Sequence, residues 1–171
     1  MPDDHLYRTD ILAWSRAQAE RLRRVAAGER VNDLDWEHVI EEVEDVGNSQ
    51  LNAVTSHLGL AMLHALKVLA WPRHTAVEHW TQEITNFLVQ AQDRFQPGMQ
   101  QHVDPAAIYA RALGRLRRLP PMRDAPAALP LPEAVGFTAA ELRDEEFGAL
   151  DLLDRIRAAQ APLLEGGGRG A

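Results

Sequence analysis

The sequence predicts an all-α protein, four-helix-bundle-like, with one long central helix and a short C-terminal helical segment after a Pro-rich connector. Apolar residues recur at helical spacing from Asp35 to Trp71, and no proline interrupts that stretch. Capping residues, prolines and glycines divide the remaining chain into shorter helical segments. No segment shows the strict alternation of apolar and polar residues that is typical of a strand.

The long helix depends on how Gly47 is interpreted. Gly47 could end one helix, with Ser49 capping a second, or it could lie within a single continuous helix. The apolar positions keep their phase across Gly47, which favours continuity, with a bend at most. These positions are Trp36, Ile40, Val43, Val54, Leu58, Ala61, Ala65 and Leu69.

The two halves of this helix differ in composition. Before Gly47 the face opposite the apolar stripe is charged, whereas after Leu58 apolar residues occur on every side. A helix that is apolar all round is either central in its own bundle or shared between subunits. We therefore expect either a deeply central helix or a homodimer. The residues outside the main stripe are Leu60, Met62, Leu63 and Leu66.

Two further helices flank the long one in sequence. The first begins between Tyr7 and Asp10, with Thr9 or Asp10 as its cap, and ends at Gly28 in the left-handed conformation. A later helix covers residues 75–95 and stops before Pro97.

The C-terminal part contains a helix, a connector and a closing helical segment. Asp104 caps a helix that has Pro105 at its first position. Thr138 and Glu141 form a capping box that opens the closing segment. Residues 1–160 are expected to form a single helical domain, and residues 161–171 a flexible tail. The extended connector is expected to wrap the bundle, and its prolines are Pro120, Pro121, Pro126, Pro130 and Pro132.

The composition predicts a cytoplasmic protein. The chain of 171 residues contains no cysteine, so disulfides and thiolate chemistry are excluded. Its first ten residues lack the basic and apolar regions of a secretory signal. The most apolar window, Leu58 to Trp71, is interrupted by His64 and Lys67 and is too short to span a bilayer. We therefore expect no membrane partner.

Charge argues against nucleic acid as the partner. A formal net charge of −7 repels phosphate on average. The arginine clusters are interpreted first as solvated helix faces. An antitoxin-like regulator that uses them to bind nucleic acid stays open as an alternative. The clusters are Arg16, Arg21, Arg23 and Arg24, and Arg111, Arg115, Arg117, Arg118 and Arg123.

Familiar catalytic motifs are absent from the sequence. It contains neither a Gly-x-Ser-x-Gly nucleophile motif nor a Gly-rich phosphate loop with Lys. No catalytic residue, cofactor or metal ligand is therefore assigned. The sequence leans toward a protein that is not an enzyme. The polar and aromatic side chains that form the candidate site are Glu41, Glu42, His57, His64, Lys67 and Trp80.

A metal-binding or acid–base enzyme with Glu and His between helices is the main alternative function. His57 and His64 share one flank of the long helix, but two turns separate them by about 10 Å, too far for one ion. Ligands from another helix would be needed, with His74, His79 or Glu83 as possible donors. The structural interpretation gives each histidine a hydrogen bond to a carbonyl or carboxylate, and makes Trp80 a core residue.

Several short motifs occur in a fixed order between residues 7 and 147. They are Asp10-x-x-x-Trp14-x-x-x-Gln18, the run from Ile40 to Ser49, Leu63-His64-Ala65-Leu66-Lys67, Trp80-x-x-x-Ile84, Tyr109-x-x-Ala112, Leu131-Pro132 and the segment Phe137 to Phe147. This ordered set resembles a bacterial family of uncharacterised helical proteins, domain of unknown function family twenty-nine. The resemblance implies a helical bundle and no established activity, and it supplies no functional residues.

The sequence as a whole favours a noncatalytic interaction module that self-associates. The reasons are the long helix with its two-sided apolar half and the missing catalytic motifs. A second copy of the chain, in a homodimer or larger homo-oligomer, is the expected partner, with an unidentified protein as the other.

Overall fold

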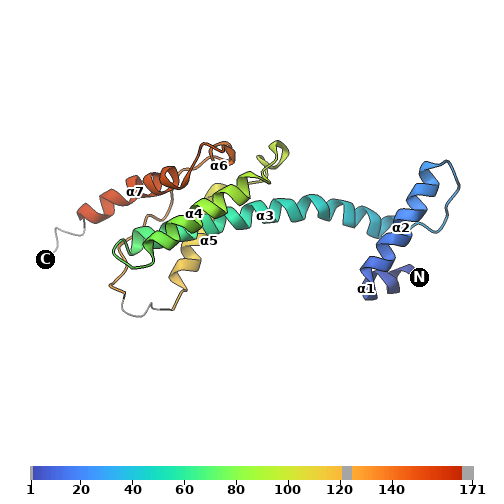
Figure 1. Ribbon diagram of the computed structural model, residues 1–171, viewed down its shortest axis with the longest axis horizontal. Helices are drawn as coiled ribbons and strands as arrows, with labels where there is room; N and C mark the ends of the chain where they lie inside the picture. The colour runs from blue at the N-terminus through green and yellow to red at the C-terminus, as the bar shows by residue number, and fades with distance from the viewer. Residues whose placement is uncertain (1, 121–124, 167–171) are drawn as a thin grey trace. The chain divides into compact units, whose positions relative to one another are not determined.

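The computed structural model describes residues 2–120 and 125–166, and it confirms the all-α class (Figure 1). No strand occurs in the described residues. The chain forms two compact units, unit 1 (Met1–Ser49) and unit 2 (Gln50–Ala171). The predicted single domain over residues 1–160 stays a prediction, because compactness does not measure whether the two units unfold together.

Unit 1 contains α1 (Pro2–Thr9), α2 (Ile11–Ala26) and the beginning of α3 (Trp36–Ala70). Asp10 caps α2 as predicted, because its carboxylate accepts a 2.9 Å hydrogen bond from the backbone N–H of Ala13. Gly28 has the predicted left-handed conformation, with φ of 85°. Helix α1 was not predicted, since its short sequence offers only Leu6 and Tyr7 as a periodic signal.

Helix α3 is one continuous element of 35 residues, which confirms that Gly47 does not break it. The division between the two units falls within this helix, between Ser49 and Gln50. By length and composition α3 could cross a membrane, with a mean hydropathy of 1.4 in its most apolar window. The segment Leu58 to Trp71 was predicted to be too short to span a bilayer, and that prediction does not apply to the whole of α3. However, 56% of that window is buried inside the protein, and a core helix meets the same criteria.

Unit 2 surrounds the second part of α3 with shorter helices. Asp104 caps α5 through a 3.0 Å bond from Ala107 N–H, with Pro105 at the first position, as predicted. The capping box of Thr138 and Glu141 is also confirmed, and it opens α6. The helices that follow α3 are α4 (Val77–Gln92), the 3₁₀ turn η1 (Pro97–Met99), α5 (Pro105–Arg117), α6 (Ala139–Arg143) and α7 (Ala149–Gly166).

The second part of α3 is the centre of the unit 2 core. Leu58, Leu63 and Leu66 are all buried, although they face different directions around the helix. Residues of α4, α5, α6 and α7 complete the same apolar cluster. The all-round apolar composition is thus explained by packing within one chain. Of the two alternatives for this half of the helix, the structure supports the central helix.

The connector between α5 and α6 is held by hydrogen bonds to three other segments. Leu129 N–H donates to Ala70 O at the end of α3, at 2.9 Å. The Tyr109 hydroxyl of α5 donates to Pro132 O at 2.8 Å, and Gln160 Nε2 of α7 donates to Pro130 O at 2.8 Å. The described part is extended and wraps the unit 2 helices, as predicted, whereas Pro121 lies outside the described residues.

The C-terminal helix is longer than expected. Helix α7 continues through Gly166, past residue 161 where the predicted tail begins. Residues 167–171 of that tail lie outside the described residues.

Candidate functional site

The six candidate residues divide between the two units. Glu41 and Glu42 belong to unit 1, whereas His57, His64 and Lys67 of α3 and Trp80 of α4 belong to unit 2. Their assignment to one functional site stays a prediction. In the described residues, no three His, Asp or Glu side chains lie close enough together to hold a metal ion.

The two candidate histidines lie against the same aromatic ring. The centroids of the His57 and His64 rings are 6.2 and 5.7 Å from that of Phe87 in α4. Nδ1 of each ring is buried, and within the described chain it has no hydrogen-bond partner. Burial lowers the pKa of His64, and the nearby Lys67 charge lowers it further. The neutral form of His64 is therefore favoured in its contact with Phe87.

Lys67 and Trp80 form a cation–π contact. Nζ of Lys67 lies 5.8 Å from the centroid of the Trp80 ring, which is itself buried. Burial lowers the pKa of Lys67, and Arg115 lowers it further. The ring of His74 stacks on the same indole at 4.8 Å. Trp80 is thus a core residue, as the structural interpretation predicted.

Unit 1 contains a polar and aromatic cluster that sequence reasoning did not identify. One oxygen of Asp35 lies 2.8 Å from His38 Nδ1 and accepts a 3.1 Å hydrogen bond from Trp14 Nε1. The Tyr7 ring stacks on His38 at 4.0 Å, and its hydroxyl donates to Glu42 Oε1 at 2.9 Å. The only sequence signal was the pairing of Asp35 and His38 three residues apart at the start of a helix.

The ionisation of this cluster is set by its hydrogen bonds. Burial opposes the charge of Asp35, but the bonds from His38 and Trp14 outweigh it and lower the pKa of Asp35. The bond to Glu42 raises the pKa of Tyr7 to about 12. At neutral pH the Tyr7 hydroxyl therefore keeps its proton and Asp35 is ionised. The cluster fixes α1 and α2 against the start of α3.

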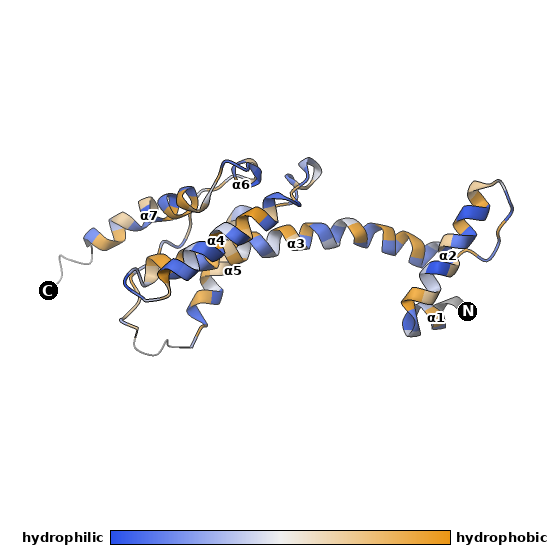
Figure 2. Ribbon diagram, in the orientation of Figure 1, coloured by the Kyte–Doolittle hydropathy of each residue, from blue (hydrophilic) through white to orange (hydrophobic). Residues whose placement is uncertain are grey.

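An exposed row of apolar side chains lies on the part of α3 in unit 1. We call Trp36, Ile40, Val43 and Val46 the α3 apolar stripe; each is more than half exposed. Figure 2 shows orange and blue bands alternating along this part of the helix. Single exposed apolar residues are common, but a contiguous row that includes tryptophan is typical of an interaction surface.

The first part of α3 thus has three distinct faces. At 100° per residue, Ile40 and Val43 fall within about 40° of Trp36, on the exposed apolar face. His38 and Glu42 lie on the face that contacts Tyr7 of α1. The third face is acidic, and its residues are Glu37, Glu41, Glu44 and Asp45.

Several arginines of the two clusters already have carboxylate partners. In unit 1, Arg21 pairs with Asp33 at 3.0 Å and Arg24 with Glu29 at 2.8 Å. In unit 2, Arg117 pairs with Glu133. Arg123 lies outside the described residues. These pairs neutralise part of the charge that the nucleic-acid alternative requires.

Comparison with known proteins gives a family and a fold but no activity. No curated protein matches the chain. The chain is similar to a solved alpha-helical protein of unknown function from Rhodospirillum rubrum, with 25% sequence identity and a TM-score of 0.61. That likeness covers 88% of this chain and 96% of the other. The family model "Domain of unknown function DUF29" matches residues 6–151, so this chain belongs to the DUF29 family.

Proposed function

We propose that this protein is a noncatalytic self-associating module that forms a homodimer through the α3 apolar stripe. The observation that carries the proposal is the contiguous exposure of Trp36, Ile40, Val43 and Val46 on one helix face. Exposed apolar surface of this kind is stabilised when a partner removes it from water. The stripe replaces the apolar second half of α3 as the reason to expect self-association.

The spacing of the stripe favours a second copy of the chain as its partner. Trp36, Ile40, Val43 and Gly47 follow one another at intervals of four, three and four residues. This is the spacing of the contact positions in coiled coils, in which two helices bury matching seams. Gly47 has no side chain, so it allows the partner helix to approach closely at that step.

The acidic face favours a parallel pair. Glu37 and Glu44 lie along one edge of the stripe; along the other edge lie Val39 and the stripe's own Val46. In a parallel dimer the acidic edge of each helix faces the valine edge of its partner. In an antiparallel dimer the two acidic edges would face each other, which is unfavourable because like charges repel.

Sedimentation equilibrium of the full chain tests this proposal. We expect a dimer for the natural sequence and at least about tenfold weaker dimerisation for Val43→Glu, because charge would be buried in the seam. Leu150→Glu in α7 is the matched control, since Leu150 is 71% exposed and Val43 69%. A natural chain that stays monomeric, or equal effects of the two substitutions, would overturn the proposal.

Single cysteines test the orientation, because the natural chain contains none. Trp36→Cys lies at one end of the stripe, so parallel pairing predicts a rapid disulfide between the two copies of residue 36. Leu150→Cys controls for random collision. A third variant, Val43→Cys, lies nearer the middle of the stripe. Disulfide formation by Val43→Cys but not by Trp36→Cys would exclude parallel pairing.

A further inference from the structure

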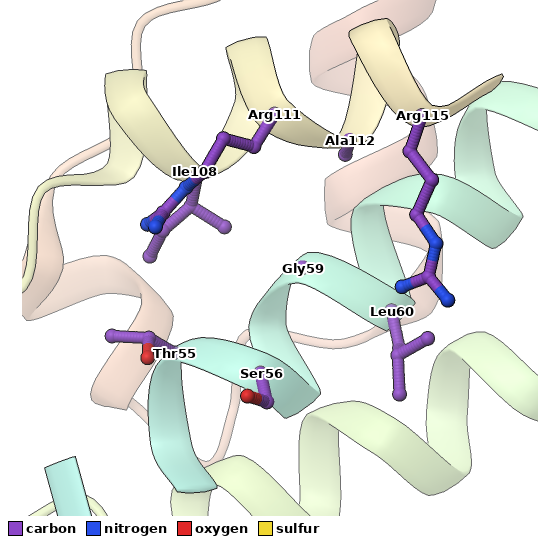
Figure 3. A pocket seen from close by; sticks show the side chains of 8 residues that line it. All are labelled: Thr55, Ser56, Gly59, Leu60, Ile108, Arg111, Ala112 and Arg115. Carbon is purple, nitrogen blue, oxygen red and sulfur yellow. The ribbon is translucent and has the colours of Figure 1, made fainter. Parts of the chain in front are cut away.

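A cavity lies in unit 2 between α3 and α5, away from the candidate residues discussed above (Figure 3). Its volume is about 230 Å³. Thr55, Ser56 and Gly59 line it from α3, and Arg111 and Arg115 from α5. Figure 3 shows both arginine side chains extending from α5 toward α3, with Gly59 between them.

Both arginines have donors available in this cavity. Nε of Arg111 donates to Ala107 O of its own helix at 3.3 Å, which leaves its two terminal nitrogens free. In the described parts of the chain, neither Arg111 nor Arg115 has a carboxylate partner. This distinguishes them from Arg117 on the same helix, which pairs with Glu133.

The surroundings of the cavity are positive although the chain as a whole is acidic. No Asp or Glu occurs in α5 or in α3 after Asp45. The charged residues of these segments are therefore all basic, and Arg115 lies close enough to Lys67 to lower the pKa of that lysine. Uncompensated positive charge beside a cavity lowers the free energy of a bound anion.

The α3 wall supplies hydroxyl groups and space. Thr55 Oγ1 donates its proton to Asn52 O at 3.1 Å, so this hydroxyl offers no donor to an anion. Ser56 makes no side-chain hydrogen bond within the described residues and can donate to a ligand. Gly59 has no side chain to fill the cavity on the α3 side. A Cβ at this position would lie 3.7 Å from Ile108.

We propose that this cavity binds the phosphate group of a small organic phosphate monoester through Arg111, Arg115 and Ser56. Each guanidinium group presents N–H donors in a planar fork that matches phosphate oxygens, and the two arginines line the cavity from one helix, four residues apart. Leu60 and Ile108 form an apolar side of the same cavity, which suits a short organic substituent. The volume is below the usual range for sites that enclose drug-sized ligands, so a small ester fits best.

Calorimetry and ³¹P NMR of the full chain with phenyl phosphate test the proposal. We expect saturable binding at one site per chain, and weaker binding of phenyl sulfate, which carries one negative charge fewer. Arg111→Gln and Arg115→Gln should each weaken binding by at least about tenfold, because each removes a charge-assisted hydrogen bond. Ser56→Ala should weaken it by a smaller factor.

Arg118→Gln is the matched control, because Arg118 follows α5 directly but does not line the cavity. We expect this substitution to change the affinity by less than about twofold, as for an exposed charge screened by salt. Equal losses for Arg118→Gln and Arg115→Gln would show diffuse attraction and overturn the site. Circular dichroism of each variant checks that the helices are intact.

Vesicles that contain phosphatidic acid identify the source of the phosphate group. Binding of phenyl phosphate without vesicle binding indicates a soluble ester, and vesicle binding abolished by Arg115→Gln indicates a lipid headgroup. Either result supports the phosphate site. Failure of both probes to bind saturably overturns it, without bearing on dimerisation through the α3 apolar stripe in unit 1.

Discussion

The carboxylate of Asp35 lies 2.8 Å from Nδ1 of His38, and both side chains are mostly buried in unit 1. The same carboxylate oxygen also accepts the indole N–H of Trp14 from α2. The backbone N–H of Asp35 donates to Gln18 Oε1 at 3.0 Å. Asp35 therefore joins α2 to the beginning of α3 through both its side chain and its backbone.

Asp35→Asn should destabilise unit 1 by about 1.5–3 kcal/mol, because the substitution replaces hydrogen bonds to a charged group with weaker ones. Urea denaturation followed by tryptophan fluorescence measures the change. Asp33→Asn is the control, since the Asp33 side chain is 63% exposed and its ion pair with Arg21 should contribute at most about 1 kcal/mol. Equal losses of stability in the two variants would show that the buried Asp35 carboxylate contributes no more than an exposed ion pair.

Gly47→Ala should stabilise α3 by about 0.5–1 kcal/mol, because alanine has the higher helix propensity and a Cβ at residue 47 meets nothing within 4 Å. Chemical denaturation in the Val43→Glu background measures this without a contribution from dimerisation. Gly28→Ala should instead destabilise by about 1–2 kcal/mol, since φ at Gly28 is 85°. A destabilising Gly47→Ala would mean that the helix does not pass straight through this residue.

His64 should make the protein less stable in mild acid. Its pKa is lowered in the folded state, so the unfolded chain binds the proton more tightly. The stabilising effect of neutral His64 is complete above its unfolded pKa of about 6.5 and is lost as pH falls through the folded pKa. Burial is the main cause of the lowered pKa of His64. The charges of Lys67 and His79 lower this pKa further, whereas Glu83 raises it.

Urea midpoints measured between about pH 7.5 and about pH 5 test this dependence. His64→Gln cannot titrate, so the variant should lose less stability over that interval than the natural chain. Other histidines titrate in both proteins, and their effect cancels in the comparison. Parallel pH profiles would contradict the prediction.

Tyr109→Phe should destabilise unit 2 by about 1–3 kcal/mol, because it leaves the buried carbonyl of Pro132 without its donor. The ring is kept, so the packing of the buried side chain changes little. Thermal unfolding and hydrogen exchange in the connector measure the effect. Unchanged exchange at the Leu129 and Leu131 amides would show that this bond does not hold the connector on α5.

The helical elements could be predicted because their signals are local. Asp10, Asp104 and Thr138 each cap a helix as expected, since a cap needs only a side-chain oxygen near the first backbone N–H groups. The continuity of α3 followed from apolar positions that keep their phase past Gly47. Helix α1 was missed because a short polar helix depends on contacts, such as the stacking of Tyr7 on His38, made far along the chain.

The candidate residues could be chosen by type but not by location. His57 and His64 were correctly placed on one flank of α3, yet their common neighbour Phe87 comes from another helix. Arg111 and Arg115 were interpreted as part of a solvated face, although they line a cavity with Ser56. The lack of Asp and Glu in both lining segments was the available signal.

The sequence by itself determined the all-α class, the long helix and most helix ends, because backbone capping and apolar periodicity act over a few residues. Only the tertiary structure decided which apolar face is covered and which charges remain unpaired. It buries Leu63 and Leu66 under helices of the same chain while Val43 stays exposed. Burial and charge pairing depend on residues distant in sequence, as the contact of Ile108 in α5 with the position of Gly59 in α3 illustrates.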